Sequence, residues 1–169
     1  MTRIAIRSLC DGENPYAVCH PAEDLSLKIE GGILAGKVDV QGIIAKSLPF
    51  LTFKGMLSFR VDFECGRCLK PFLREFRVPL RCSYEQVNEV RPGWEVALDV
   101  RYIPSSVQEL DILPEVREAI AFALPLVPLC NRDCPGLCPR CGGDLSSGVC
   151  GCKPMEEDTP WEALRKLKT

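Results

Sequence analysis

Cysteine is the residue type whose number and spacing in this chain indicate chemistry. The chain has eleven cysteines, and eight of them fall into two groups along the sequence. Structural zinc is held by four thiolates at the corners of a tetrahedron, and these thiolates commonly come in pairs separated by two to four residues. Eight thiols can hold one or two zinc ions. The predicted metal ligands are Cys65, Cys68, Cys130, Cys134, Cys138, Cys141, Cys150 and Cys152.

The way these thiols pair around metal is open between two arrangements. In the simpler one, each ion takes four cysteines, and the two sets are Cys138, Cys141, Cys150, Cys152 and Cys65, Cys68, Cys130, Cys134. In the other, the thiolates bridge metal ions within one shared cluster. The remaining three cysteines lack a partner at metal-ligand spacing and are predicted to be ordinary thiols. They are Cys10, Cys19 and Cys82.

Disulfide bonds are the alternative use of these cysteines, and the expected compartment argues against them. Residues 1–7 contain no apolar run long enough for a signal peptide, and no stretch approaches the ~18–20 apolar residues of a membrane span. We therefore expect a cytoplasmic protein without a membrane partner. Disulfides rarely persist in that reducing environment. Eleven cysteines would also leave one thiol without a disulfide partner.

The elements expected to position the cysteines are mostly strands. Apolar and polar residues alternate over 25–29, 37–41, 57–64 and 75–81. A period of two is typical of half-buried antiparallel strands. This pattern places the first Cys-x-x-Cys pair at the tip of a β-hairpin. Residues 1–24 carry several turn-forming residues and are expected to be irregular.

One main helix is predicted after the strands. Asp111 suits the N-cap, Pro114 suits the first turn, and Pro125 ends the helix. A further short strand is expected near residues 96–102. The helix carries an apolar stripe that is expected to pack on the sheet. Its members are Val116, Ala119, Ile120, Ala123 and Leu124.

These elements predict an α+β fold. It is mostly antiparallel sheet with one main helix and a small Cys-rich, zinc-binding appendage, and barrel-like closure of the sheet is left open. We expect residues 1–129 to form the sheet domain, with the hairpin tip and a C-terminal helix. Residues 130–169 are expected to form the metal-binding segment and a short tail helix. Trp161, Leu164 and Leu167 share one face of that tail helix, which is expected to dock back on the body.

A local basic stretch offers contacts to RNA. The net charge of the chain is −2, so bulk charge does not attract nucleic acid. Residues 65–82 nevertheless hold five basic residues against a single acid, Glu75. Without further information, a solvated face with surface ion pairs is the alternative interpretation. The residues expected to contact RNA phosphates are Arg67, Lys70, Arg74, Arg77 and Arg81.

The sequence favours a protein without catalysis or a small-molecule substrate. His20 is the one histidine, and we expect it to lie in a solvated loop without a catalytic partner. The spacing of Cys134, Cys138 and Cys141 formally matches the iron–sulfur motif of radical S-adenosylmethionine enzymes. Those enzymes resemble partial (β/α) barrels, whereas this chain lacks alternating βαβα patterns. A closed set of four thiolates is typical of a structural site. An iron–sulfur or redox protein is therefore the less favoured interpretation of the cysteine spacing.

Several short motifs together resemble those of the YceD family, bacterial and plastid proteins described as large ribosomal RNA subunit accumulation proteins. The motifs are Glu64-Cys65-x-Arg67-Cys68-Leu69-x-Pro71-Phe72, Ala123-Leu124-Pro125 with Pro128, Cys134-x-Gly136-Leu137-Cys138-Pro139-x-Cys141-Gly142, and Cys150-x-Cys152. The resemblance implies a non-enzymatic role in 23S ribosomal RNA accumulation and large-subunit biogenesis. The implied partner is the 23S precursor or a large-subunit assembly intermediate.

A protein partner is the alternative to direct RNA contact. In that case zinc would act only as a staple for a protein-interaction module, with a ribosomal protein or an assembly factor as the partner. The sequence alone does not separate this interpretation from RNA binding.

Overall fold

The computed structural model describes residues 3–89, 100–148 and 150–152. Strands make up most of this part of the chain, and one α-helix accompanies them. The strands are β1 (Arg3–Ala5), β2 (Gly12–Pro21), β3 (Gly32–Ser47), β4 (Phe50–Glu64), β5 (Pro71–Val87), β6 (Val100–Pro104) and β7 (Glu109–Asp111). The helix α1 spans Leu113–Ala123, and short 3₁₀ turns cover Ile6–Ser8, Ala22–Leu25 and Leu145–Ser147.

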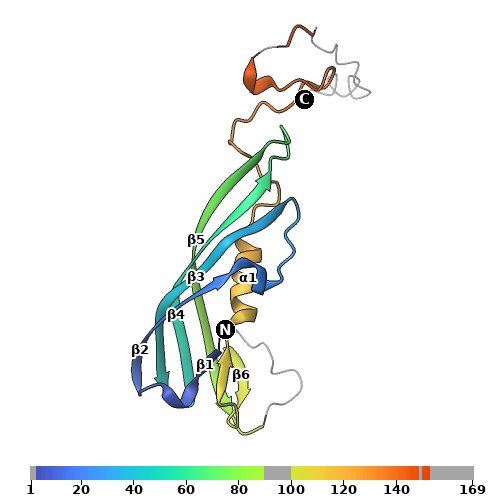
Figure 1. The fold of residues 1–169 in the computed structure, drawn as a ribbon. Coiled ribbons are helices and arrows are strands. Elements are labelled where there is room, and N and C mark those ends of the chain that lie inside the picture. The colour runs from blue at the N-terminus through green and yellow to red at the C-terminus, as the bar shows by residue number, and fades with distance from the viewer. Residues whose placement is uncertain (1–2, 90–99, 149, 153–169) are drawn as a thin grey trace, which may run out of the picture.

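The main sheet has the strand order β2-β3-β4-β5-β6, and β1 pairs with β7 in a separate two-stranded sheet. All pairs are antiparallel except β5 with β6, which is parallel. The main sheet is open, because β2 and β6 are its two edges. Figure 1 shows the long strands β3, β4 and β5 in a curved sheet, with α1 against one face and residues 130–148 beyond the tip of the β4–β5 hairpin.

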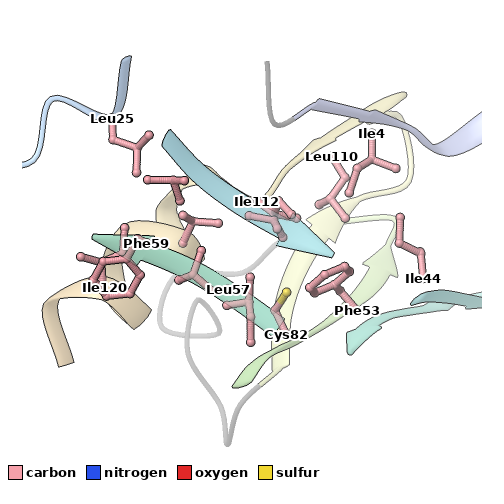
Figure 2. Packing of buried hydrophobic residues seen from close by; sticks show 14 of the residues in the cluster. Ile4, Leu25, Ile44, Phe53, Leu57, Phe59, Cys82, Leu110, Ile112 and Ile120 are labelled. Atoms are coloured by element: carbon pink, nitrogen blue, oxygen red, sulfur yellow. The ribbon is translucent and has the colours of Figure 1, made fainter. Parts of the chain in front are cut away.

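The core lies between α1 and the inward face of the sheet. Alternate residues of β4, such as Leu57 and Phe59, are almost completely buried, and Val116 and Ile120 of α1 face them. Figure 2 shows Phe59, Leu57 and Ile120 within this packed cluster. Fully burying one such side chain stabilises the fold by about 1.5–3 kcal/mol. Burial of this apolar layer therefore holds α1 to the sheet.

Two glycines let a phenylalanine cover the middle of the sheet. Gly42 of β3 and Gly55 of β4 stand opposite each other in the register. A Cβ atom on either one would lie 2.8 or 2.6 Å, respectively, from Cζ of Phe53, closer than real contacts allow. The ring of Phe53 thus fills the space that two side chains would otherwise take, and it is 1% exposed. Aromatic cover of sheet glycines is a known way to restore packing.

The fold class and the main elements confirm the sequence prediction. The first Cys-x-x-Cys pair lies between the end of β4 and the start of β5, as expected for a hairpin tip. The N-cap of helix α1 is Ile112, one residue after the predicted Asp111, although Oδ1 of Asp111 accepts from the N–H of Leu113 at 3.0 Å; the helix ends before Pro125, as predicted. The apolar stripe of α1 packs into the core, as predicted.

The prediction for the N-terminal part is wrong. Residues 12–21 form β2, which pairs with β3 along its whole length, and residues 25–29 are not a strand. Pro15 and Pro21 suggested breakers, but proline is tolerated on an edge strand because the missing N–H is not needed there. The inward positions of β2 include Asn14 and His20, so the apolar alternation is hard to see in the sequence.

Some expectations fall partly or wholly outside the described residues. The strand expected near 96–102 is observed as β6, which begins at Val100, and residues 90–99 lie outside the description. The expected tail helix with Trp161 also lies outside it. Within the described ranges, no helix combines the length and the hydropathy needed to cross a bilayer.

The expectation for His20 is also wrong, because the structure buries this residue. Its exposed fraction is 4%, and it lies on the inward face of β2. Burial lowers the pKa of His20 below its usual value of 6.5, although Asp24 and Asp111 act in the opposite direction. The folded protein therefore favours the neutral imidazole.

This burial makes stability depend on pH. Because the folded pKa is lowered, the unfolded chain binds more protons, so stability is lost as pH falls from 7 through 6.5 toward the folded pKa. We expect the free energy of unfolding, measured by urea titration, to fall more between pH 7 and pH 5.5 in the native chain than in His20→Gln. The same pH dependence in both proteins would contradict this assignment.

Candidate metal centres

The first thiol group joins the hairpin tip to the segment that follows α1. Cys65 and Cys68 come from the tip, and Cys130 and Cys134 come from the later segment. The four sulfur atoms lie within 4.8 Å of one another, with Cys65 to Cys134 at 3.8 Å and Cys68 to Cys130 at 3.7 Å. Thiolates around zinc, at a Zn–S distance of about 2.3 Å, are about 3.8 Å apart. The group therefore has the dimensions of a four-thiolate metal site.

The backbone of the hairpin tip is folded tightly around this group. The N–H of Leu69 donates to the carbonyl of Cys65 at 2.9 Å, and Leu69 takes a left-handed conformation with φ 59°. The N–H of Gly66 donates to the carbonyl of Pro128 at 2.8 Å, which links the tip to the chain after α1. A Cβ atom at Gly66 would lie 3.0 Å from Cγ1 of Val127, so a small residue is favoured there.

Backbone N–H groups favour a thiolate at one position of the first group. They lower the pKa of Cys65 to about 6, with the N–H of Cys130 contributing most and that of Cys68 next. By contrast, the neighbouring thiol of Cys134, together with burial, raises the pKa of Cys130 to about 12. Four thiolates this close repel one another unless a cation neutralises them. This arrangement is typical of sulfur ligands that ionise together on binding a metal ion.

The second thiol group lies wholly within the Cys-rich segment. Its members have sulfur atoms within 4.8 Å of one another, and they are Cys138, Cys141, Cys150 and Cys152. The N–H of Cys138 donates to the carbonyl of Gly143 at 2.8 Å, and the N–H of Gly142 donates back to the carbonyl of Cys138 at 2.9 Å. Gly142 has φ +69°, which glycine adopts without strain. The two groups match the simpler of the two predicted pairings.

The second group has the same electrostatic character as the first. Backbone N–H groups of Cys141 and Arg140 lower the pKa of Cys138 to about 6, and the N–H of Arg140 lies 3.4 Å from its sulfur. The neighbouring thiols of Cys141 and Cys150 raise the pKa of Cys152 to about 12. Both groups could hold a metal ion, because each presents four sulfur ligands close together.

Three of the predicted RNA-binding residues make contacts within the protein instead of pointing freely into solvent. Nη1 of Arg67 donates to the carbonyl of Cys134 at 2.9 Å, and Nη2 of Arg74 donates to the carbonyl of Leu129 at 2.7 Å. Lys70 forms an ion pair with Asp144 of the Cys-rich segment. All three contacts run from the β4–β5 hairpin to the chain after α1. They therefore help to hold the Cys-rich segment against the hairpin tip.

The Lys70–Asp144 pair is part of a local network that the sequence did not reveal. Asp144 accepts from the N–H of Ser146 at 2.9 Å and from the hydroxyl of Ser147 at 3.2 Å. These contacts and Lys70 lower the pKa of Asp144 well below its usual range, with Lys70 the largest cause. Asp144 and its neighbours carry no spacing motif, so only the folded arrangement identifies this link between the two thiol groups.

Arg77 and Arg81 are exposed on the outward face of β5, as strand parity predicts. The structure adds a third cation that was not predicted. Lys54 of β4 stands directly opposite Arg81 in the register and is exposed. None of the three makes an ion pair within the described ranges. The alternation of Leu51, Phe53 and their neighbours could have placed Lys54, had the strand been extended back beyond residue 57.

The comparisons with known proteins agree with this geometry. The model of the YceD family, described as "Large ribosomal RNA subunit accumulation protein YceD", matches residues 53–168. This match covers more than half of the chain and includes both thiol groups. The chain therefore belongs to the YceD family.

Individual relatives match over shorter stretches. An uncharacterized protein of Mycobacterium tuberculosis is 31% identical over 104 residues, which are 62% of this chain and 49% of that protein. The chloroplastic "Large ribosomal RNA subunit accumulation protein YCED homolog 1" of Arabidopsis thaliana is 29% identical over 75 residues, 44% of this chain and 22% of that protein. The chain thus spans about half the length of its mycobacterial relative.

A relative from another bacterium matches over a longer stretch of this chain. The "Large ribosomal RNA subunit accumulation protein YceD" of Haemophilus influenzae is 26% identical over 126 residues, which are 70% of this chain and 66% of that protein. No solved structure matches the chain.

The two-group arrangement predicts how single cysteines affect metal content. We expect Cys68→Ser and Cys150→Ser each to lower the metal content, measured by elemental analysis, from two ions per chain to one. Only Cys68→Ser should free the hairpin tip from the chain after α1, which amide exchange at Gly66 would report. Cys10→Ser is the matched control, because Cys10 belongs to neither group. Two ions retained in Cys150→Ser would contradict the assignment.

Proposed function

We propose that this protein is a zinc-stabilised factor for accumulation of 23S ribosomal RNA that binds the RNA precursor or a large-subunit assembly intermediate in the cytoplasm. In this proposal it has no catalysis of its own. The observation that carries it is the pair of four-cysteine groups at the tip of a basic hairpin, in a chain that belongs to the YceD family. The names of its relatives point to the same process.

Zinc is the proposed ion because both groups are closed sets of four sulfur ligands. Zinc accepts a tetrahedron of thiolates without redox chemistry, and such closed sites are structural. The Cys-rich segment also needs an ion for its order, since the side chains buried there are mainly the cysteines themselves. An iron–sulfur cluster would use the same ligands but would colour the protein brown.

RNA contact is proposed for the hairpin and its flank. Arg77 and Arg81 are exposed and are free to pair with phosphates. Arg67, Lys70 and Arg74, which were expected to join them, also position the Cys-rich segment against the tip. We propose that these three act on RNA mainly by holding that segment in place.

One observation favours a second candidate function, that of a protein-interaction module stapled by zinc. Three large apolar residues at and after the end of α1 are strongly exposed: Phe122 at 83%, Leu126 at 102% and Val127 at 61%. Exposed large apolar side chains mark contacts with a protein partner where they form one patch. A ribosomal protein or an assembly factor is the partner proposed in this case.

Crosslinking in cells, followed by sequencing of the attached RNA, tests the proposed function. We expect enrichment of 23S precursor RNA with the native chain and loss of most of it with Arg77→Glu/Arg81→Glu, since each reversed charge repels phosphate. Lys28→Glu is the control, because Lys28 is exposed but lies outside the basic hairpin. No enrichment with folded native protein would overturn RNA binding and favour the protein-interaction module.

Purified protein tests the metal assignment. We expect a colourless protein with two zinc ions per chain, and chelation should unfold residues 130–152 while β3, β4 and β5 stay protected in amide exchange. A brown protein with absorption in the visible range would contradict the zinc assignment.

A further inference from the structure

The outward face of the main sheet is not covered by any described element. The inward face of β2 to β5 packs on α1 and the core, whereas no described element covers the other face. Residues on that face alternate with the buried ones along each strand. The chemistry of this face is therefore available to a partner.

A pair of like charges lies in the middle of this face. Lys54 and Arg81 stand directly opposite each other on β4 and β5, so their Cβ atoms are about 5 Å apart. Like charges at this spacing repel each other and destabilise a sheet. An anion that binds between them would relieve this repulsion. Arg77 lies four residues from Arg81 on the same face.

The residues of β4 and β5 next to this pair on the outward face are uncharged, whereas Glu13 of β2 lines a pocket together with Ile43 and Lys54. Ile43 is opposite Lys54 on β3, and Pro79 separates Arg81 from Arg77. Thr52, Ser83 and Met56 complete the surroundings. Nearer the hairpin tip the face is charge-balanced instead, because Arg60 stands opposite Glu75 and Asp62 follows it. The positive patch is thus local, and we call Lys54, Arg77 and Arg81 with Ile43, Met56 and Pro79 the outer patch.

The outer patch combines its cations with apolar surface. Met56 is 46% exposed and Ile43 is 43% exposed, and Pro79 is also exposed. A nucleic-acid duplex turns its stacked bases inward and offers mainly phosphates and sugars to a flat surface. A single strand offers phosphates together with unstacked bases, which proteins most often stack on aromatic side chains; here the exposed apolar side chains would take that place. The composition of the outer patch fits a single strand better than a duplex.

From this arrangement we infer that the outer patch binds a single-stranded segment of RNA, with Lys54 and Arg81 on the phosphates and Met56, Ile43 and Pro79 under a base. This inference rests on the proposed function, and it adds a ligand class and residues that the basic hairpin alone does not indicate. Lys54 is the residue that distinguishes it, because it lies on β4 outside the hairpin stretch 65–82.

Binding of short RNAs to the full, zinc-loaded chain tests the inference. Fluorescence anisotropy would compare a single-stranded 12-nucleotide RNA with a duplex of the same sequence. We expect Lys54→Ala to weaken single-strand binding by about 5-fold and to reduce the slope of log K against log salt by about 0.7, the loss of one phosphate contact. Met56→Ser should weaken binding of the single strand by about 3-fold and leave the weaker duplex binding unchanged.

Two controls separate a binding effect from a folding effect. Lys54→Arg keeps the charge and should retain native affinity, and Lys28→Ala removes an exposed charge outside the outer patch. Native affinity of both Lys54→Ala and Met56→Ser, with binding still lost in Arg77→Glu/Arg81→Glu, would overturn the inference and leave the proposed function standing. Tighter binding of the duplex would overturn the single-strand assignment. Binding of neither RNA by the native chain would overturn both.

Discussion

The contact between the hairpin tip and the chain after α1 determines where the Cys-rich segment lies on the sheet domain. It consists of the four sulfur atoms of the first thiol group, together with the hydrogen bond from Gly66 to Pro128. Arg67 and Arg74 add hydrogen bonds to the carbonyls of Cys134 and Leu129. The second thiol group begins four residues after Cys134, so its place follows from the first group.

The sheet and the Cys-rich segment are stabilised by different interactions. The sheet is held by apolar burial against α1, which does not involve the thiol groups. The Cys-rich segment has almost no apolar side chains of its own and relies on sulfur ligands and on polar contacts such as Lys70 to Asp144. Two kinds of interaction thus stabilise two parts of one chain, and they meet at the hairpin tip.

Much of this arrangement could be predicted from the sequence, and the parts that could not share a physical reason. The alternation over 57–64 and 75–81 and the capping pattern at Asp111 predicted β4, β5 and α1, because local periodicity and caps are properties of single elements. The strand β2 was missed because its inward positions include polar residues, and only pairing with β3 makes it a strand. Local sequence does not encode that pairing.

The candidate site likewise combines residues that the sequence indicates with contacts that only the fold creates. Spacing pointed to the eight cysteines that the fold gathers into two groups, and the charge of the stretch 65–82 pointed to its basic residues. Their roles depend on residues far away in sequence, as Arg67 does on Cys134 and Lys70 does on Asp144. Cross-strand register likewise brings Lys54 beside Arg81, although 27 residues separate their numbers. The composition of a stretch can indicate its charge, but the folded structure determines which charged side chains are exposed and without an ion-pair partner.

The separation of the two halves of the first thiol group has a consequence for how the protein is made. Cys68 and Cys130 are 62 positions apart, and a ribosome releases the earlier pair well before the later one. During synthesis the hairpin can form at once, since its strands are adjacent in sequence. The thiolates at its tip must wait until the residues after α1 leave the exit tunnel. An ion at the first thiol group would therefore close the structure late, and the supply of metal during translation would govern how many chains mature.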